Sequence, residues 1–315
     1  MSTTNKHNKS KCVLRTVVWV PVVAVLIIGG LYVYADNKPF IFEGFNQKIQ
    51  TGGALEAHYL QDGEFCVEKM TADAEEPILK YTVYYPKELK TSDKTYPLLL
   101  VVNGTGGKAT RYEPLFELYA SWGFVTVGNQ DKGTGSGETT ITTLNYMLAQ
   151  NENPDSVFYH KIDTENIGIT GFSQGGAAVY NAITKFEESD RFKAAVPISA
   201  VCERTAAAVT DYPYDTADIK CPVLLLAGTR GQFETESVTP LADLNQMYDK
   251  TTSPKAMARR VGMDHDQMMY SAGGYVIAWF RWQLMGDNDA AKVFIGDSPE
   301  LQNNSLYQDQ RINLS

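Results

Sequence analysis

One serine has the sequence context that nucleophilic catalysis requires. Ser173 lies at the centre of the pentapeptide GFSQG, which follows a short apolar run (residues 167–170) and precedes the helix-compatible stretch AAVY. A serine hydroxyl is a weak nucleophile, so it must be held on a strained turn beside a base that accepts its proton. The two glycines leave room for that turn and for close packing of strand and helix. The pattern is typical of a nucleophile elbow and predicts covalent catalysis by Ser173.

A histidine stands in the chain order that this chemistry uses. The chain contains four histidines, His7, His58, His160 and His265. In enzymes with a nucleophile elbow the triad runs in the order serine, acid, histidine, and only His265 follows the serine. It comes after a predicted strand (residues 256–261) and before a predicted apolar helix (residues 272–284). We therefore expect His265 to be the general base, in a loop at the end of a strand.

The acid of the triad should follow the predicted strand at residues 222–228. An aspartate three or four residues beyond the closing glycine is usual, but Gly231 and Gln232 occupy those positions. Glu234 is the first carboxylate in this loop, and a glutamate can orient a catalytic histidine. We therefore expect Glu234 to be the acid. Two other glutamates stay open as alternatives because they also lie between serine and histidine: Glu236 and Glu203.

Two backbone N–H groups are expected to form the oxyanion hole. The first is that of Gln174, directly after the nucleophile. The second is that of Thr105, in the glycine-rich loop at residues 103–107 that follows an apolar strand (residues 96–102). This loop is not a P-loop, because the motif GxxxxGK[ST] would need a glycine at Val102 and a hydroxyl residue at Ala109.

The chain resembles the cutinase-type polyester hydrolases and their dienelactone-hydrolase relatives, within the α/β-hydrolase superfamily. The resemblance spans about residues 78–286 and is carried by the stretches PLLLVVNGTGG, SWGFVTV, IGITGFSQGG, FKAAVPIS, CPVLLLAG and GYVIAWFRWQLMGD. It implies an eight-stranded, mostly parallel sheet with helices on both faces, and ester cleavage by Ser173, Glu234 and His265. At two positions the chain differs from many relatives, with Phe172 where they have His and Gln174 where they often have Met.

The N-terminus predicts a membrane anchor. Residues 16–35 carry no charge and are rich in Val, Ile and Leu, and a helix of this length rises about 30 Å. Residues 1–15 contain four basic residues and no acid, so the positive-inside rule keeps them in the cytoplasm and places the remainder outside. A cleaved signal peptide ending near Ala35 is the alternative, which would give a secreted protein.

Composition divides the remaining chain and limits its partners. We expect a stalk at residues 36–60, a hydrolase domain at residues 61–286 and a polar tail at residues 287–315. The first 35 residues hold four of the 28 basic residues and none of the 37 acidic ones, so the exported part has a net charge of −13. Such an acidic surface disfavours nucleic acid as a partner.

The cysteines give no metal motif. No spacing of Cys12, Cys66, Cys202 and Cys221 fits a zinc site. A bridge between Cys202 and Cys221 and a set of free thiols both stay open. The chemistry implied by the candidate triad requires neither a metal nor a cofactor.

The leading functional prediction is a membrane-anchored, extracytoplasmic serine hydrolase that cleaves small or polymeric carboxylic esters. A thioesterase, a peptidase or an acyltransferase would use the same residues. A binding module that kept the fold and lost catalysis is the alternative outside the enzyme class. An organophosphonate probe distinguishes a serine hydrolase from a binding module, because a binding module would not be labelled at Ser173.

Overall fold

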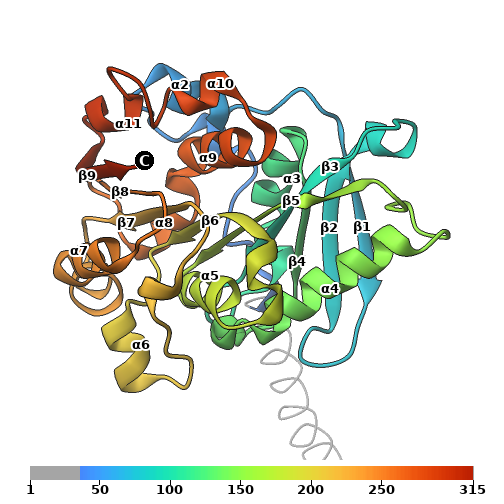
Figure 1. Cartoon of the computed structure of the whole chain (residues 1–315), viewed down its shortest axis with the longest axis horizontal. Coiled ribbons are helices and arrows are strands. Elements are labelled where there is room, and N and C mark those ends of the chain that lie inside the picture. Colours follow the sequence, from blue (N-terminus) through green and yellow to red (C-terminus); the bar gives the residue numbers. More distant parts are fainter. Residues whose placement is uncertain (1–35, 315) are drawn as a thin grey trace, which may run out of the picture. The chain divides into compact units, whose positions relative to one another are not determined.

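Within residues 36–314, which are the residues that this computed structural model describes, nine strands form one mixed sheet (Figure 1). The strand order is β1-β2-β4-β3-β5-β6-β7-β8-β9. The strands are β1 (Val67–Asp73), β2 (Lys80–Pro86), β3 (Tyr96–Val102), β4 (Val125–Asn129), β5 (Ile162–Phe172), β6 (Phe192–Ile198), β7 (Val223–Gly228), β8 (Lys255–Arg260) and β9 (Tyr307–Asn313).

Parallel pairing dominates the centre of the sheet. Strands β3 to β8 pair in parallel, whereas β1 with β2, β2 with β4 and β8 with β9 pair antiparallel. The sequence prediction of eight strands is therefore wrong by one strand. The additional strand is β9, whose polar sequence YQDQRIN lies on the edge of the sheet, where one side needs no strand partner.

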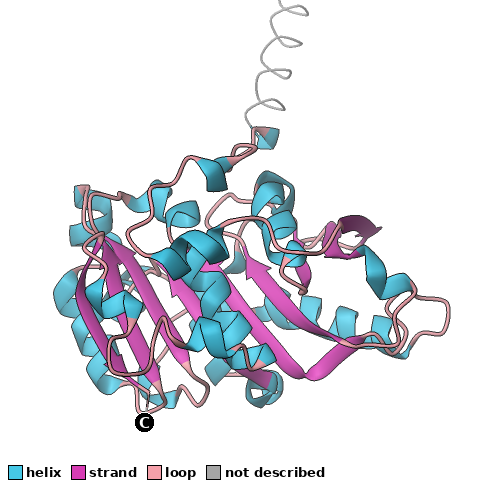
Figure 2. Ribbon diagram, turned by 90° about the horizontal axis from the view of Figure 1, so that it is seen from above, coloured by secondary structure: helices cyan, strands magenta, loops and turns pink. Residues whose placement is uncertain are grey.

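The central strands are continuous apolar runs because the sheet is covered on both faces. All residues of β3 (YPLLLVV) and of β7 (VLLLAG) are buried. Figure 2, which looks at the molecule from above, shows helices on both sides of the sheet. The helices are α2 (Ala54–Leu60), α3 (Glu113–Ser121), α4 (Glu138–Glu152), α5 (Gln174–Thr184), α6 (Glu203–Val209), α7 (Leu241–Lys250), α8 (His265–Ser271), α9 (Gly273–Met285), α10 (Asn288–Ala291) and α11 (Glu300–Asn303).

Alternation along β5 divides the core between the two faces. Ile167 and Ile169 belong to a buried cluster with Leu144 and Met147 of α4. Gly168, which points the other way, faces α9: a Cβ at this position would lie 2.8 Å from the ring of Phe280. The missing side chain thus lets α9 pack directly on the strand that leads to the candidate nucleophile.

Contacts divide the chain into two units, Met1–Phe40 and Ile41–Ser315, and the second holds every strand of the described residues. The predicted cytoplasmic tail (residues 1–15) and anchor (residues 16–35) lie outside the described residues. Among residues 36–314, no helix is both long and apolar enough to cross a bilayer.

The two segments expected to flank the hydrolase domain contribute to its fold. From Ile41 on, the expected stalk belongs to the same unit as the sheet, and its helix α2 packs on α9. The expected polar tail supplies α10, α11 and β9. A buried ion pair links the expected stalk to the sheet, since Nη1 of Arg260 in β8 donates to Oε1 of Glu56 in α2 at 2.6 Å.

Candidate active site

Ser173 occupies a strained turn between β5 and α5. Its backbone angles are φ 59° and ψ −120°, a combination that L-residues rarely adopt. The turn is possible because backbones approach closely at the two glycines of the motif: a Cβ on Gly171 would lie 2.3 Å from the carbonyl oxygen of Gly175. The N–H of Ser173 donates to the carbonyl of Ile198 in β6 at 3.0 Å, which ties the turn to the neighbouring strand.

Three side chains from distant parts of the chain form one hydrogen-bonded line. Oγ of Ser173 lies 2.9 Å from Nε2 of His265, and Nδ1 of His265 lies 2.7 Å from Oε2 of Glu234. All three residues are buried or nearly so. The carboxylate at Nδ1 selects the tautomer with its hydrogen on that nitrogen, which leaves Nε2 free to accept the serine proton. This arrangement can activate a serine hydroxyl for attack on a carbonyl carbon.

The sequence predicts a loop at His265, but the structure has this residue as the first of helix α8. Asp264 is the N-cap: its carboxylate accepts from the N–H of Gln267 at 3.2 Å, and Oε1 of Gln267 accepts from the N–H of Asp264 at 3.1 Å. This reciprocal pair is a capping box, and it fixes where the helix starts. The helix start in turn places the imidazole after the end of β8.

Glu234 lies in a short π-helix, η7 (Phe233–Val238), rather than in an open loop. The turn begins after Gly231, whose φ of +84° favours glycine, and Thr239 N–H donates to the Glu234 carbonyl at 2.8 Å. The Glu234 side chain has no exposed surface, and its Oε1 accepts from Ser199 Oγ and from Gly228 N–H, each at 2.6 Å. These donors satisfy the carboxylate inside the protein.

The two alternative carboxylates lie elsewhere. Glu236 is exposed on η7. Glu203 accepts hydrogen bonds from Thr216 and forms an ion pair with Lys250 at 3.1 Å. The geometry therefore favours Glu234 as the acid among the three candidates.

The two segments that carry the expected oxyanion donors lie close to the serine. Gln174 begins α5, so its N–H has no acceptor within the helix. The loop after β3 passes close to the serine, because a Cβ on Gly104 would lie 3.5 Å from Cβ of Ser173. Among the N–H groups of Gly104, Thr105, Gly106 and Gly107, only that of Thr105 has no acceptor within the described residues.

Buried side chains fix the loop that carries Thr105. Nδ2 of Asn103 donates to the carbonyls of Asn129 and Asp131 at 2.8 and 2.9 Å. The hydroxyl oxygen of Tyr112 accepts a hydrogen bond from the N–H of Gly104 at 3.3 Å. Burial raises the pKa of Tyr112 to about 12, so this phenol stays neutral. A rigid loop keeps its N–H groups in place before charge develops, which is the condition for electrostatic stabilisation of an oxyanion.

Sequence reasoning missed the residues that support the acid and flank the base. Ser199, with no exposed surface, follows β6 and carries no motif that would mark it as a partner of Glu234. Phe172 and Phe233 both pack against the imidazole ring of His265, with ring centroids 4.6 and 4.9 Å from that of the imidazole. In the sequence, Phe172 is distinguished only by its difference from many relatives, which have His at this position.

Within residues 36–314, no group of three or more His, Cys, Asp and Glu side chains is placed to hold a metal ion. Cys66, Cys202 and Cys221 are free thiols, so the described structure contains no bridge between Cys202 and Cys221. Burial raises the pKa of the Cys221 thiol to about 12, which makes it a poor nucleophile.

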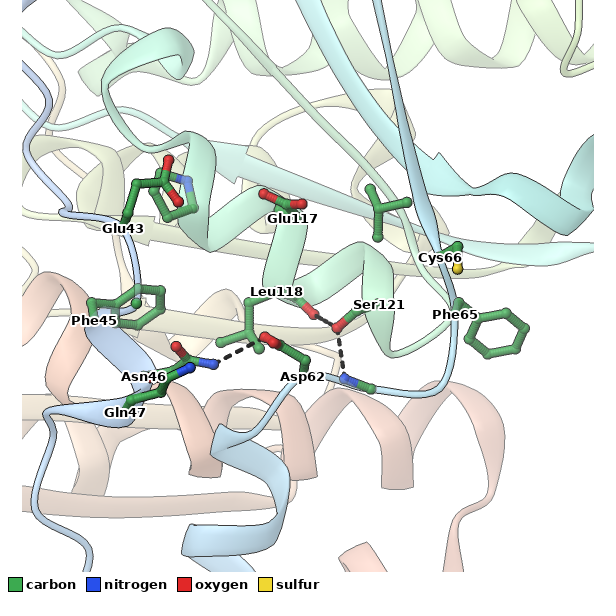
Figure 3. Close-up of a pocket in the computed structure, with 14 residues that line it drawn as sticks. Glu43, Phe45, Asn46, Gln47, Asp62, Phe65, Cys66, Glu117, Leu118 and Ser121 are labelled. Atoms are coloured by element: carbon green, nitrogen blue, oxygen red, sulfur yellow. Dashed lines mark hydrogen bonds between the residues drawn. The ribbon is translucent and has the colours of Figure 1, made fainter.

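An acidic cavity lies on another part of the molecule and shares no residue with the candidate triad. It has a volume of about 350 Å³, and Figure 3 shows Glu43, Asp62 and Glu117 among its lining side chains. Burial raises the pKa of Glu117, and the neighbouring carboxylates of Glu43 and Asp62 raise it further. Ionised Glu117 therefore destabilises the folded state relative to the unfolded one.

We expect Glu117→Gln to raise the melting temperature at neutral and alkaline pH. An acid whose pKa is raised by folding binds its proton more tightly in the folded state, so stability falls as pH rises through the interval between the unfolded and folded pKa values. The gain should be a few degrees at most at about pH 8 and should vanish at about pH 4, where the wild-type side chain is also neutral. Thermal unfolding of both proteins at the two pH values measures this difference, and an equal gain at both would contradict the electrostatic cause.

We expect Glu234→Gln to lower turnover by about 10⁴, with the fold retained. The amide keeps the shape of the side chain but carries no negative charge to stabilise the imidazolium. Because Ser199 and Gly228 both donate to Oε1, the NH2 group would take the place of Oε2 and donate to Nδ1, which favours the wrong tautomer of His265. Glu236→Gln is the matched control from the same turn and should keep wild-type activity, as should Glu203→Gln. Steady-state hydrolysis of p-nitrophenyl butyrate by the three variants decides the assignment, and a large loss in either control instead would overturn it.

Comparison with known protein families gives one match and one negative result. A model of the PETase family, described as PET hydrolase-like, matches residues 50–311, which is most of the chain. The matched segment includes the serine, the histidine and the acid of the candidate triad. A search among curated proteins found no match.

Proposed function

Because the chain belongs to the PET hydrolase-like family, which comprises ester hydrolases of the cutinase-like type, we propose that it cleaves a polyester with Ser173, His265 and Glu234 as its catalytic triad. The hydrogen-bonded line from Ser173 Oγ through His265 to Glu234, at 2.9 and 2.7 Å, is the observation that carries this proposal. Family membership supports the polyester as the substrate class. The residue roles are supported by the geometry and by the chain order of serine, acid and histidine.

In the acylation half, Oγ of Ser173 attacks the ester carbonyl carbon while Nε2 of His265 accepts the hydroxyl proton. The carbonyl electron pair moves onto the oxygen, where the N–H groups of Gln174 and Thr105 stabilise the negative charge. Glu234 holds Nδ1–H and stabilises the imidazolium that forms. When the carbonyl reforms, the bond to the alcohol oxygen breaks, and His265 gives that oxygen the proton.

In the deacylation half, water takes the place of the serine hydroxyl. Nε2 of His265 accepts a proton from the water as its oxygen attacks the acyl carbon. The N–H groups of Gln174 and Thr105 also donate to the second oxyanion and stabilise it. When it collapses, the bond to Ser173 breaks, Oγ takes the proton back from His265, and the carboxylic acid leaves.

Release of soluble products from a polyester film tests this function. The wild-type domain should release carboxylic acid from amorphous poly(ethylene terephthalate) or from an aliphatic polyester, and the Ser173→Ala protein should release none above background. A folded wild-type protein that hydrolyses no polyester and no p-nitrophenyl ester would contradict the proposal. Hydrolysis of the p-nitrophenyl ester without hydrolysis of any polyester would support the assignment as a serine esterase and contradict the proposed substrate class.

We also propose that residues 16–35 anchor the enzyme in the cell membrane with the hydrolase domain outside the cytoplasm. The uncharged apolar run of 20 residues, preceded by four basic residues and no acid, supports this proposal. An extracytoplasmic location suits an enzyme whose polymeric substrate cannot enter a cell.

We expect the anchor to stay uncleaved. The mass of the intact protein, extracted from membranes with detergent, should include residues 1–35. A soluble protein that begins at Asp36 would show a signal peptide and a secreted enzyme, and would leave the proposed chemistry unchanged.

A further inference from the structure

An exposed phenyl ring stands beside the imidazole of His265. The Phe233 side chain is 61% exposed, and its ring meets that of His265 edge-to-face, at a centroid distance of 4.9 Å and an angle of 85°. Phe172 contacts the imidazole at 4.6 Å but is only 8% exposed. Of the two rings that flank the base, Phe233 is therefore the one that a bound molecule can reach.

The backbone that buries the candidate acid also presents this ring to solvent. Phe233 and Glu234 are consecutive residues of η7, and the second has no exposed surface. The buried hydrogen bonds of Glu234 to Ser199 and Gly228 hold the turn in place. The phenyl ring thus has a fixed backbone position beside the base. An exposed ring of this size retains most of its apolar surface for burial against a ligand.

We propose that Phe233 is a specificity residue that contacts the alcohol portion of the ester substrate. This inference rests on the proposed function, in which Nε2 of His265 gives its proton to the alcohol oxygen. That oxygen must lie within hydrogen-bond distance of the imidazole, so the group bonded to it passes close to the rings that flank the imidazole. Phe233 is the accessible one.

The acyl portion is held by other elements. Its carbon is bonded to Ser173, at the start of α5, and its oxygen faces the N–H groups of Gln174 and Thr105. None of these residues belongs to η7. Removal of the Phe233 ring should therefore change selectivity for the alcohol group and leave selectivity for the acyl group unaffected.

Three esters separate the two portions: ethyl acetate, benzyl acetate with a larger alcohol, and ethyl benzoate with a larger acyl group. Hydrolysis is followed by pH-stat titration for wild type, Phe233→Ala and Phe233→Leu. For Phe233→Ala the kcat/KM ratio of benzyl acetate to ethyl acetate should fall about tenfold, with the ratio of ethyl benzoate to ethyl acetate unchanged. The ratio of benzyl acetate to ethyl acetate for Phe233→Leu should lie between those of wild type and Phe233→Ala. Phe42→Ala, which removes another exposed phenylalanine, should have the wild-type ratios.

The remaining outcomes overturn the inference in different ways. An equal loss on all three esters, or a shifted pH–rate profile in Phe233→Ala, would show that the ring only positions or shields His265. A change only in the ratio of ethyl benzoate to ethyl acetate would show that Phe233 contacts the acyl portion of the substrate instead of the alcohol portion. A wild-type protein that hydrolyses none of the three esters would contradict the proposed function itself, whereas normal hydrolysis with unchanged ratios in Phe233→Ala would contradict this inference alone.

Discussion

Ser173→Ala is expected to lower ester hydrolysis by about 10⁵ to 10⁶, because the triad members act as a unit and alanine has no atom that can form the acyl-enzyme. The fold should be unaffected. The hydroxyl of Ser173 is held by His265 alone among the described residues, and the backbone that forms the turn is fixed by Gly171, Gly175 and the hydrogen bond to Ile198. The residual rate measures what the oxyanion donors contribute without a nucleophile.

The measurement is the initial rate on p-nitrophenyl butyrate, with circular dichroism and the melting temperature as controls for folding. Ser136→Ala is a matched control, since it removes a serine hydroxyl from η4 (Thr134–Ser136) rather than from the elbow. That variant should keep its activity. Near-normal hydrolysis by folded Ser173→Ala would remove the basis of the serine-hydrolase account.

His265→Ala has the second-largest expected effect, a loss comparable with that of Ser173→Ala. Without the imidazole, no described side chain hydrogen-bonded to Ser173 Oγ can accept its proton or return it to the alcohol. The variant leaves Glu234 buried with one partner fewer, so a lower melting temperature is expected as well.

Kinetics of His265→Ala beside His160→Ala check this role. His160 is exposed, has a positive φ of 53° and precedes β5, and its substitution should leave the rate unchanged. If His160→Ala were the inactive protein and His265→Ala the active one, the base would be misassigned. A His265→Ala protein that fails to fold would be replaced by His265→Gln, which keeps a polar side chain of similar size.

Much of the candidate site could be predicted because it depends on local pattern and chain order. The GFSQG motif marks the elbow, and the strand expected at residues 96–102 is β3 (Tyr96–Val102). The resemblance to cutinase-type polyester hydrolases is confirmed by the family match over residues 50–311. Asp264 and Gln267 also have the spacing of a capping box, a signal that predicts the start of α8 in place of a loop.

Features that depend on tertiary contact could not be predicted in this way. The π-helix η7 brings Glu234 inward, where it meets Ser199 and the N–H of Gly228, and none of these partners is near it in the sequence pattern. Strand β9 has no apolar run or clean alternation, because an edge strand with mostly half-buried residues needs neither. Its antiparallel pairing with β8 stabilises it as a strand, although its composition does not predict one.

Covalent labelling of Ser173 tests the central claim most directly. The wild-type protein is treated with a fluorophosphonate, and intact mass and peptide mapping identify the modified residue. We predict one adduct per chain, on the peptide that contains Ser173, and no adduct on the Ser173→Ala protein. A folded wild-type protein that stays unlabelled would contradict an activated serine at this site and with it the proposed function. A Ser173→Ala protein that is labelled as strongly as the wild type would do the same.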